Sequence, residues 1–237
     1  QGVVSDFKSQ VYRRDGSIIW ISESARIVYD EGRLLYFEGT VEDVTEQQRS
    51  QVALSQSQVA LAQRERYLEA LVEVQRRLLS LEHEDEIYTA CLDPLGNVSR
   101  ANRIYIFTNS RGRAGSLLMN MRAEWCAEGI PAEIANPLVQ NLPYAGYFPR
   151  WQAMLAAGEP IQGIVADFPA SERSVLEPQG VVSILVLPLI VHSEFFGFIG
   201  FDNCVDDRLW EASELTLLKA ASTALALALE RQQTGAA

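Results

Sequence analysis

Two histidines and three cysteines are the side chains of this sequence best suited to nucleophilic, acid–base or metal chemistry. His83 lies in "SLEHEDE", between two helical stretches, and His192 lies in the turn of "VHSEF". A serine–histidine–aspartate triad needs a histidine held beside a nucleophile, and neither position offers that setting. His83 has the acidic neighbours of a phosphate-accepting histidine but lacks the apolar periodicity of a paired helix. We therefore predict no catalytic residue and no enzyme activity in this chain.

The three cysteines, Cys91, Cys126 and Cys204, are far apart in the sequence. No two of them have the spacing of a zinc site or of a redox motif. Free thiols in a reducing compartment are the expected state, which favours a cytoplasmic location. The carboxylates are scattered singly, as on a solvated surface. We therefore predict no metal site.

Composition limits the partners of the chain. Its 237 residues are 48% hydrophobic, and the net charge is −11. Such acidity disfavours nucleic acid or an anionic membrane as a partner; it is typical of a soluble surface, with an acidic functional surface as the alternative. The longest apolar run, residues 181–191, contains Ser183 and Pro188 and is shorter than the roughly 20 residues that span a bilayer. We expect no membrane insertion. No signal peptide is visible. Because the sequence begins at Gln1 and not at a methionine, we expect a fragment or a processed product.

Residues 7–44 have the alternating pattern of three antiparallel strands. Glycine-containing turns, "DG" and "DEG", separate the strands and are typical of hairpins. Three strands bury little surface alone, so a helical layer or a partner chain is expected to cover one face. The last strand runs directly into a stretch without glycine or proline, from Thr40 to Asp93. This stretch predicts a long helix over residues 42–79 and a break near residues 81–84.

The long helix contains a seven-residue repeat. "SQVAL" occurs at residues 50–54 and again at 57–61, and Leu68 continues the series of Leu54 and Leu61. Valines in the same repeats offer a competing register. A seam of this kind favours a parallel dimer whose register is weakly fixed. A solvated helix that packs on its own domain is the alternative.

Residues 85–231 have an α+β pattern. Pro94 and Gly96 are predicted to end a helix, and two strands follow in "ANRIYIFTNS" and "LLMNMRAEWCA". Residues 129–180 are rich in proline and glycine and hold short helices. A strand pair then covers "VVSILVLPLIV" and "FFGFIGFDN", and an alanine- and leucine-rich helix follows. Strands between flanking helices predict one antiparallel sheet with helices against it.

The first part of the chain resembles a known sensory fold. The stretch "YRRDGSIIWISESARIVYDEGRLLYFEGTVEDVTEQQR" (residues 12–49) is similar to the C-terminal half of a PAS domain, the PAC motif. The resemblance implies that Asp43, Val44 and Thr45 form the junction that couples the last strand to an output helix. It also implies that the N-terminal half of the PAS fold is missing here.

The remainder resembles a GAF domain. The segments "RYLEALVEVQRRLLS", "AEWCAEGI", "FPRWQAMLAAGEPI", "SILVLPLIVHSEFFGFIGFDN" and "LWEASELTLLKAASTALALALER" follow in the order of that family. The expected organisation is a partial PAS sheet (1–45), a connector helix (46–63), a GAF domain (64–231) and a tail (232–237). The fold class is therefore α+β: a partial antiparallel PAS sheet, a long connector helix, and an antiparallel GAF sheet flanked by helices.

The GAF resemblance implies a small-molecule pocket between the sheet and the helices of the middle segment. An apolar pocket with few polar groups is typical of ligand sites, and packing of the same aromatics as ordinary core is the alternative. No cysteine has the adjacent histidine of a bilin-attachment site, neither histidine suits a haem ligand, and the motif of cyclic-nucleotide GAF domains is absent. We therefore predict no cofactor, with an unknown small molecule as ligand. By resemblance, the pocket walls include Ile104, Trp125, Phe148, Trp151, Phe168 and Ser183.

The two resemblances together predict a sensory and signal-relay region of a bacterial signalling protein. It would act as a homodimer through its connector and terminal helices. A covalently linked output domain outside this chain, expected to be a histidine kinase, would read the change. The regulatory part of a diguanylate cyclase and a dimerisation scaffold without a ligand are the alternatives. Domain order alone suggests the output domain, and this is an argument by analogy.

Overall fold

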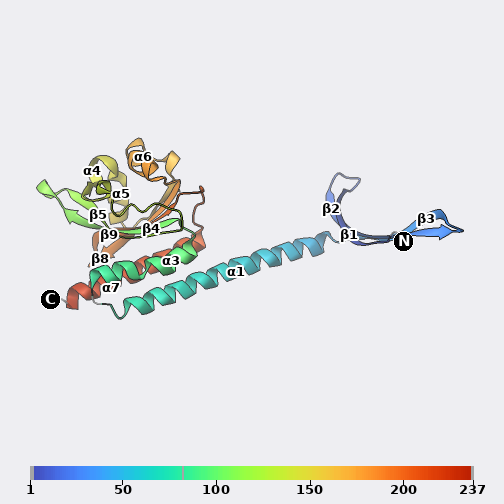
Figure 1. Ribbon diagram of the computed structural model, residues 1–237, viewed down its shortest axis with the longest axis horizontal. Coiled ribbons are helices and arrows are strands. Elements are labelled where there is room, and N and C mark those ends of the chain that lie inside the picture. Colours follow the sequence, from blue (N-terminus) through green and yellow to red (C-terminus); the bar gives the residue numbers. More distant parts are fainter. Residues whose placement is uncertain (1–2, 82, 236–237) are drawn as a thin grey trace. The chain divides into compact units, whose positions relative to one another are not determined.

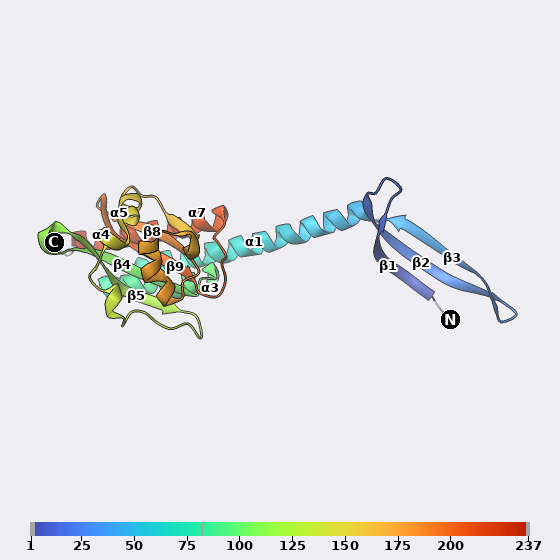
Figure 2. The same cartoon turned by 90° about the horizontal axis from the view of Figure 1, so that it is seen from above.

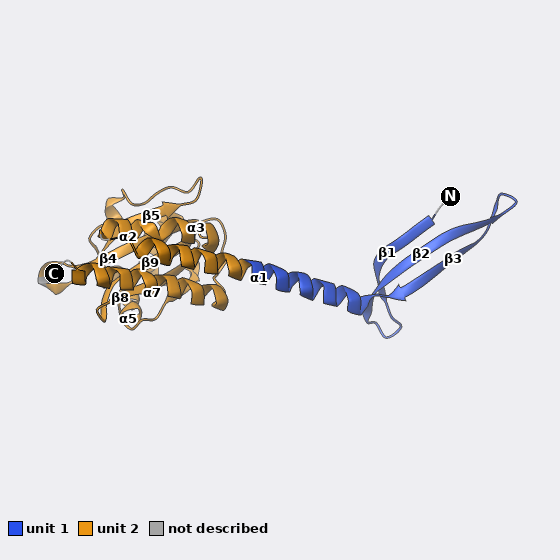
Figure 3. Ribbon diagram, turned by 90° about the horizontal axis from the view of Figure 1, so that it is seen from below, with its two compact units in different colours: residues 1–62 blue, residues 63–237 orange. Residues whose placement is uncertain are grey.

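The computed structural model describes residues 3–81 and 83–235. The chain divides into two compact units, Gln1–Ala62 and Gln63–Ala237, which are coloured separately in Figure 3. The helix α1 (Thr45–Leu78) begins in the first unit and ends in the second. Antiparallel sheets combined with helices confirm the α+β class that the sequence predicts.

A three-stranded antiparallel sheet, in the order β1-β2-β3, forms most of the first unit. Gly16 and Gly32 occupy its two turns with φ values of 84° and 82°, a backbone conformation that glycine adopts without strain. No residue of β3 is buried. The three predicted strands are thus confirmed, with the first beginning four residues earlier than expected. Their bounds are β1 (Val3–Tyr12), β2 (Ile18–Asp30) and β3 (Arg33–Asp43).

The helix α1 lies within one residue of the predicted end and three of the predicted start. Its part in the second unit buries one stripe of side chains at spacings of three and four, as an amphipathic helix does. These side chains are Tyr67, Ala70, Val74 and Leu78. Its part in the first unit is exposed from residue 49 to residue 62.

A six-stranded antiparallel sheet, in the order β6-β5-β4-β9-β8-β7, forms the centre of the second unit. The strands predicted from the apolar runs are confirmed, and two short edge strands join them. The bounds are β4 (Arg103–Arg111), β5 (Leu117–Cys126), β6 (Leu142–Pro143), β7 (Ile161–Ile164), β8 (Ser183–Val191) and β9 (Glu194–Asn203).

Two hydrophobic cores lie on opposite faces of this sheet. One face packs against the end of α1 and against α2 (Glu84–Ala90), α3 (Leu92–Ser99) and α7 (Ala212–Gly235); we call this the first core. The other face packs against α4 (Tyr144–Tyr147), α5 (Pro149–Ala156) and α6 (Ala170–Leu176); we call this the second core. Figure 1 shows α3 and α7 on one side of the sheet and α4 to α6 on the other, and Figure 2 shows the same unit from above. Each face of the sheet is therefore covered by helices.

The helix around Pro94 differs from the prediction. Pro94 and Gly96 do not end a helix; they lie inside α3, which begins at Leu92 after α2 has stopped at Ala90. Proline is tolerated in the first turn of a helix, because its missing N–H would have no partner there. The restart of the helix just before Pro94 therefore explains why the chain remains helical.

The terminal helix α7 is long and apolar enough to cross a membrane by length and composition alone. In this fold it buries Leu218, Leu225 and Leu229 completely, at helical spacing, in the first core. A helix that packs against β8 in this way is the core helix of a globular unit, so its composition needs no bilayer to explain it.

Candidate functional site

The structure does not bring the six predicted pocket residues into one site. Phe148, Trp151 and Phe168 meet in the second core. Ile104 and Trp125 lie on the opposite face of the sheet, in the first core. They are cross-strand partners on β4 and β5, and successive side chains of a strand point to opposite faces. Tyr105, the next residue along β4, therefore faces the second core, whereas Ile104 faces the first core.

The aromatic side chains of the second core pack closely against one another. The ring centroids of Phe148 and Trp151 are 4.6 Å apart, and those of Trp151 and Phe198 are 6.1 Å apart. All three side chains are at most 2% exposed. Contacts of this kind stabilise a core and leave little space between the rings. The three rings therefore fill this part of the second core without a ligand.

A cleft of about 230 Å³ opens at the edge of the second core. It lies between the β5–β6 connection, α4, α6 and the turn at Glu177–Gln179. Leu142 and Val175 belong both to its wall and to the margin of the second core. The proline- and glycine-rich stretch 129–180 supplies the whole lining, and that composition was its only signal in the sequence. The lining residues are Glu133, Asn136, Leu138, Leu142, Tyr147, Ser174, Val175, Pro178 and Gln179.

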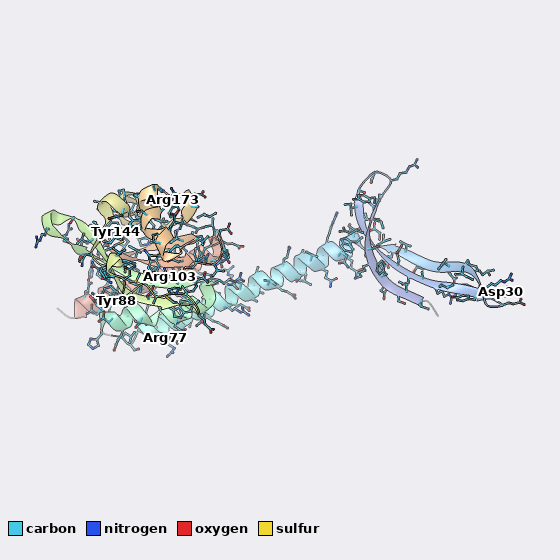
Figure 4. The ribbon with its side chains drawn as sticks, turned by 45° about the horizontal axis from the view of Figure 1, so that its top comes forward. Asp30, Arg77, Tyr88, Arg103, Tyr144 and Arg173 are labelled. Atoms are coloured by element: carbon cyan, nitrogen blue, oxygen red, sulfur yellow. The ribbon has the colours of Figure 1, made fainter. Side chains whose placement is uncertain are left out.

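A buried salt-bridge cluster centred on Arg103 lies behind this cleft. The Arg103 side chain is 1% exposed, and it approaches Glu124 at 3.4 Å and Asp202 at 3.5 Å. Its Nη2 donates to the carbonyls of Pro131 and Gln179 at 3.1 and 3.2 Å. Arg103 therefore ties the strand β4 to two segments that frame the cleft. Figure 4 labels Arg103 within the sheet.

The two carboxylates of the cluster have different roles. Glu124 accepts hydrogen bonds from the backbone N–H groups of Glu133 and Ile134, each at 2.9 Å, and so fixes the β5–β6 connection. Asp202 accepts a 2.8 Å hydrogen bond from the Tyr105 hydroxyl. Burial raises the pKa of Asp202 to about 7, although Arg103 and Tyr105 both favour the charged form. Asp202 thus titrates near neutral pH in the folded unit.

A second polar group follows Asp202 along β9 and leads to α7. Asn203 donates to the carbonyl of Arg208 at 2.6 Å and to Ser183 at 3.0 Å. Ser183, one of the predicted pocket residues, also donates to the Arg208 carbonyl and is fully buried. Ser183 therefore holds the loop between β9 and α7 and does not line the cleft.

The same loop reaches the helix α7 and, through Glu214 of α7, is linked to α1. Arg208 donates to Glu214, in the first turn of α7, at 3.1 Å. Tyr67 of α1 donates its hydroxyl to the same carboxylate at 3.0 Å. Near the other end, Arg231 of α7 donates to the carbonyls of Leu78 and Leu81. Tyr67, in the last third of α1, thus meets the start of α7, and the end of α1 meets the last turns of α7, so this part of α1 and α7 run side by side in the same direction.

A separate ion pair, between a buried carboxylate and a partly exposed guanidinium, holds the helices that cover the second core. Glu172 of α6 is 1% exposed and accepts two hydrogen bonds from Arg150, at 2.9 and 2.7 Å. Trp151 donates its ring N–H to the same carboxylate at 2.9 Å. The Arg150 guanidinium also lies 4.8 Å from the ring centre of Phe168. Phe168 and Trp151 thus belong to a clamp between α5 and α6.

The predicted junction between strand and helix lies wholly within the first unit. The N–H of Val44 donates to the carbonyl of Trp20, and the Trp20 N–H donates to the Thr45 hydroxyl, both at 2.9 Å. Asp43 accepts hydrogen bonds from the hydroxyl and the N–H of Thr45, which lower the pKa of its carboxyl. A carboxylate at this position also favours a helix start. The last strand is thereby joined to α1 without a loop.

The thiols have no catalytic or metal-binding setting in the described residues. Cys91 is fully buried in the first core, and burial raises its pKa to about 12. Cys126 lies across from Arg103 at the end of β5, and burial raises its pKa as well. Among residues 3–81 and 83–235, no three histidine, cysteine or carboxylate side chains gather into a metal-binding group. A thiol with a raised pKa is a poor nucleophile.

The second unit has the fold of solved GAF domain structures. The phycoerythrobilin-bound GAF domain of a cyanobacterial phytochrome matches with a TM-score of 0.59 at 16% identity, over 72% of this chain and 98% of that one. The photoproduct state of GAF3 from Slr1393 of Synechocystis sp. PCC6803 matches with a TM-score of 0.55 at 19% identity, over 65% of this chain and 98% of that one. At such identities the likeness concerns the fold alone.

The sequence also has a curated relative. The methanogenesis regulatory histidine kinase FilI of Methanothrix harundinacea (strain 6Ac) is 35% identical over 207 residues, which is 87% of this chain. The chain spans 22% of the length of that relative. The family model described as "GAF domain" matches residues 66–229, so the chain belongs to the GAF domain family.

Proposed function

We propose that this chain is the sensory and relay region of a histidine kinase. Its GAF unit would bind a small molecule in the cleft and pass the change to the paired helices α1 and α7. The family match and the histidine kinase relative support a signalling role. The catalytic domain would lie outside this segment.

The observation that carries the proposal is the continuous set of buried polar contacts between the cleft and the helix pair. Gln179 lines the cleft and its carbonyl is held by Arg103, which also contacts Asp202. The next residue along β9, Asn203, holds the loop whose Arg208 binds Glu214. Buried polar groups cost free energy when their partners move away, so a shift at one end favours a matching shift at the other.

Occupancy of the cleft would act by changing the position of the turn at Glu177–Gln179. Arg103 would follow the Gln179 carbonyl, and the Arg208 loop would re-seat against α7. A ligand shifts such an equilibrium only by its difference in affinity for the two arrangements. The last third of α1 and the helix α7 would then move as a pair, because contacts join them at Tyr67 and at Leu78.

The first unit is, in this proposal, the C-terminal half of a PAS domain. Its three strands and its direct passage into α1 at Asp43, Val44 and Thr45 support that assignment. Movement of the last strand would turn α1 without being absorbed by a loop. Separated free thiols and an acidic surface support a cytoplasmic setting.

The connector helix would pair with a second copy of the chain. Large apolar side chains on α1 are between 42% and 64% exposed and recur at intervals of seven residues. Exposed apolar series of this kind are typical of helices that pair. The members of the two series are Leu54, Leu61 and Leu68, and Val52 and Val59.

A diguanylate cyclase parent would use the same relay, and the histidine kinase relative favours the kinase. A scaffold without a ligand would have no use for a cleft coupled to buried polar groups. Two observations speak against a bilin in this cleft. Cys91 is enclosed in the first core, and the cleft of about 230 Å³ is smaller than the roughly 300–1,000 Å³ of drug-sized sites.

The test is a thermal-shift screen of a metabolite library on the whole chain and two tryptophan variants. Ser174 lines the cleft and is exposed, so Ser174→Trp fills the cleft from its rim. Arg111→Trp adds the same bulk at an exposed strand end outside the cleft. A compound that raises the Tm of the wild type and of Arg111→Trp but not of Ser174→Trp supports the proposal. A library without such a compound contradicts it.

A further inference from the structure

The cleft has a single carboxylate and no cationic side chain in its lining. Its polar groups are Glu133, Asn136, Ser174 and Gln179, with the hydroxyl of Tyr147. The remaining lining side chains are apolar. An anionic ligand group would meet one negative charge here and no positive partner. A positively charged group would gain both a partner and an apolar wall.

Glu133 is held in place but is not neutralised. Asn136 donates to its carboxylate at 2.6 Å, and Glu124 fixes its backbone N–H. None of the ion pairs formed by the described residues includes Glu133. A carboxylate held by one amide retains acceptor capacity for a further donor. Because its backbone is fixed, the Glu133 carboxylate is held at the cleft, where it can accept that further hydrogen bond.

The buried Arg103 behind the cleft does not reverse this polarity, and Arg173, next to the lining residue Ser174, is paired with Glu177 at 3.6 Å. Arg103 reaches the cleft wall only through the Gln179 carbonyl. Its guanidinium lies 3.4 Å from Glu124, whose carboxylate offsets its charge, and 3.5 Å from Asp202. Opposite charges at such distances favour one another's ionised forms, so little of the positive charge acts on the cleft. The Glu133 carboxylate therefore sets the sign of the field at the site.

The size of the cleft limits the ligand. An engineered apolar cavity of about 150 Å³ holds one benzene molecule, so a cleft of about 230 Å³ suits one ring with a short side chain. Tyr147 is 41% exposed at the rim, and its ring face can attract a cation. We propose that the cleft binds a small organic ammonium compound with an apolar body, paired to the carboxylate of Glu133. This inference rests on the proposed sensory function and names the ligand class of the same site.

The test compares three probes of matched size on the whole chain: 2-phenylethylamine, 2-phenylethanol and 3-phenylpropionate. Isothermal titration is expected to give at least tenfold tighter binding of the ammonium than of the carboxylate. In Glu133→Gln the affinity for 2-phenylethylamine should fall to that for 2-phenylethanol. Glu128→Gln, in the same connection but exposed and outside the cleft, should leave all three affinities unchanged. Thermal melts of both variants establish that they are folded.

Three outcomes overturn the ligand class and leave the sensory proposal standing. The first is binding of the carboxylate as tightly as the ammonium, and the second is an unchanged ratio of the two affinities in Glu133→Gln. The third is that none of the three probes binds. The sensory proposal itself fails only in the library screen, when no compound is excluded by Ser174→Trp.

Discussion

At the scale of single residues, the second unit is held by buried charges whose partners come from distant parts of the chain. Arg103 and Asp202 are 99 residues apart in sequence and adjacent in the sheet. Glu172 collects three hydrogen bonds from two residues of α5. Removal of one member of such a set leaves the others buried without a partner.

The clamp of Glu172 gives a stability prediction. Glu172→Ala should lower the free energy of unfolding by about 2–3 kcal/mol, because Trp151 loses its buried acceptor and Arg150 its carboxylate. Glu177→Ala is the matched control, since its pair with Arg173 is about half exposed, and it should cost less than about 1 kcal/mol. Urea unfolding measures both. Equal losses in the two variants would show that burial of the pair is not what stabilises the clamp.

The raised pKa of Asp202 gives a pH prediction. Its ordinary pKa is near 4 and its folded pKa is about 7, so the folded chain holds a proton that the unfolded chain releases between these values. The stability contributed by the protonated group is therefore present at low pH and is lost as pH rises toward 7. Relative to Asp202→Asn, the wild type should lose up to about 1.4 kcal/mol per pH unit in this window. Urea unfolding at pH 5.5 and 7 checks this, and parallel pH profiles of the two proteins would refute it.

Sequence reasoning at this scale found the aromatic residues but not the site. Phe148, Trp151 and Phe168 were predicted by resemblance to line a ligand pocket, and the structure packs them into the second core, which was the alternative. Glu133 and Gln179 gave no local signal, because their role depends on a loop that Glu124 and Arg103 hold from the sheet. Periodicity cannot reveal a contact of this kind.

At the scale of elements, hydrophobic periodicity predicted most of the structure. The apolar runs of β4, β8 and β9 and the alternation in β5 gave the central strands. The break between α2 and α3 was missed, because proline normally ends a helix and here stands in the first turn of a new one. The face to which Trp125 points could not be predicted either, since it depends on strand register.

The contact between α3 and β5 predicts that a glycine-to-alanine change within a helix lowers stability, which is the opposite of its usual effect. A Cβ atom at Gly96 would lie 2.6 Å from the Trp125 ring, which must then move. Gly96→Ala should therefore lower stability by about 1–3 kcal/mol, although alanine normally stabilises a helix by about 1 kcal/mol. At Gly235 of α7 no atom lies within 4 Å of such a Cβ, so Gly235→Ala should be neutral or slightly stabilising. Thermal melts compare the two variants, and a stabilised Gly96→Ala would contradict the close packing of α3 on Trp125.

At the scale of the whole molecule, the account requires two copies of the chain to pair through α1. Leu61→Glu, within the leucine series, should raise the dimer dissociation constant at least tenfold, because it places a charge in the apolar seam. Ala60→Glu, at an exposed position about a quarter turn away from both the leucine and the valine series, should leave it unchanged. Light scattering at tens of micromolar measures both. A monomeric wild type under these conditions would remove the dimer from the account.

The central claim is that occupancy of the cleft changes the pairing of α1 with α7 through the Arg208–Glu214 contact. Hydrogen–deuterium exchange tests this most directly, with and without a saturating compound that Ser174→Trp excludes. Exchange should change in residues 66–78 of α1 and 212–222 of α7. In Arg208→Gln the helices should no longer respond, while the compound still protects residues 133–147. Exchange that changes only around the cleft, with both helices unaffected in the wild type, would contradict the central claim.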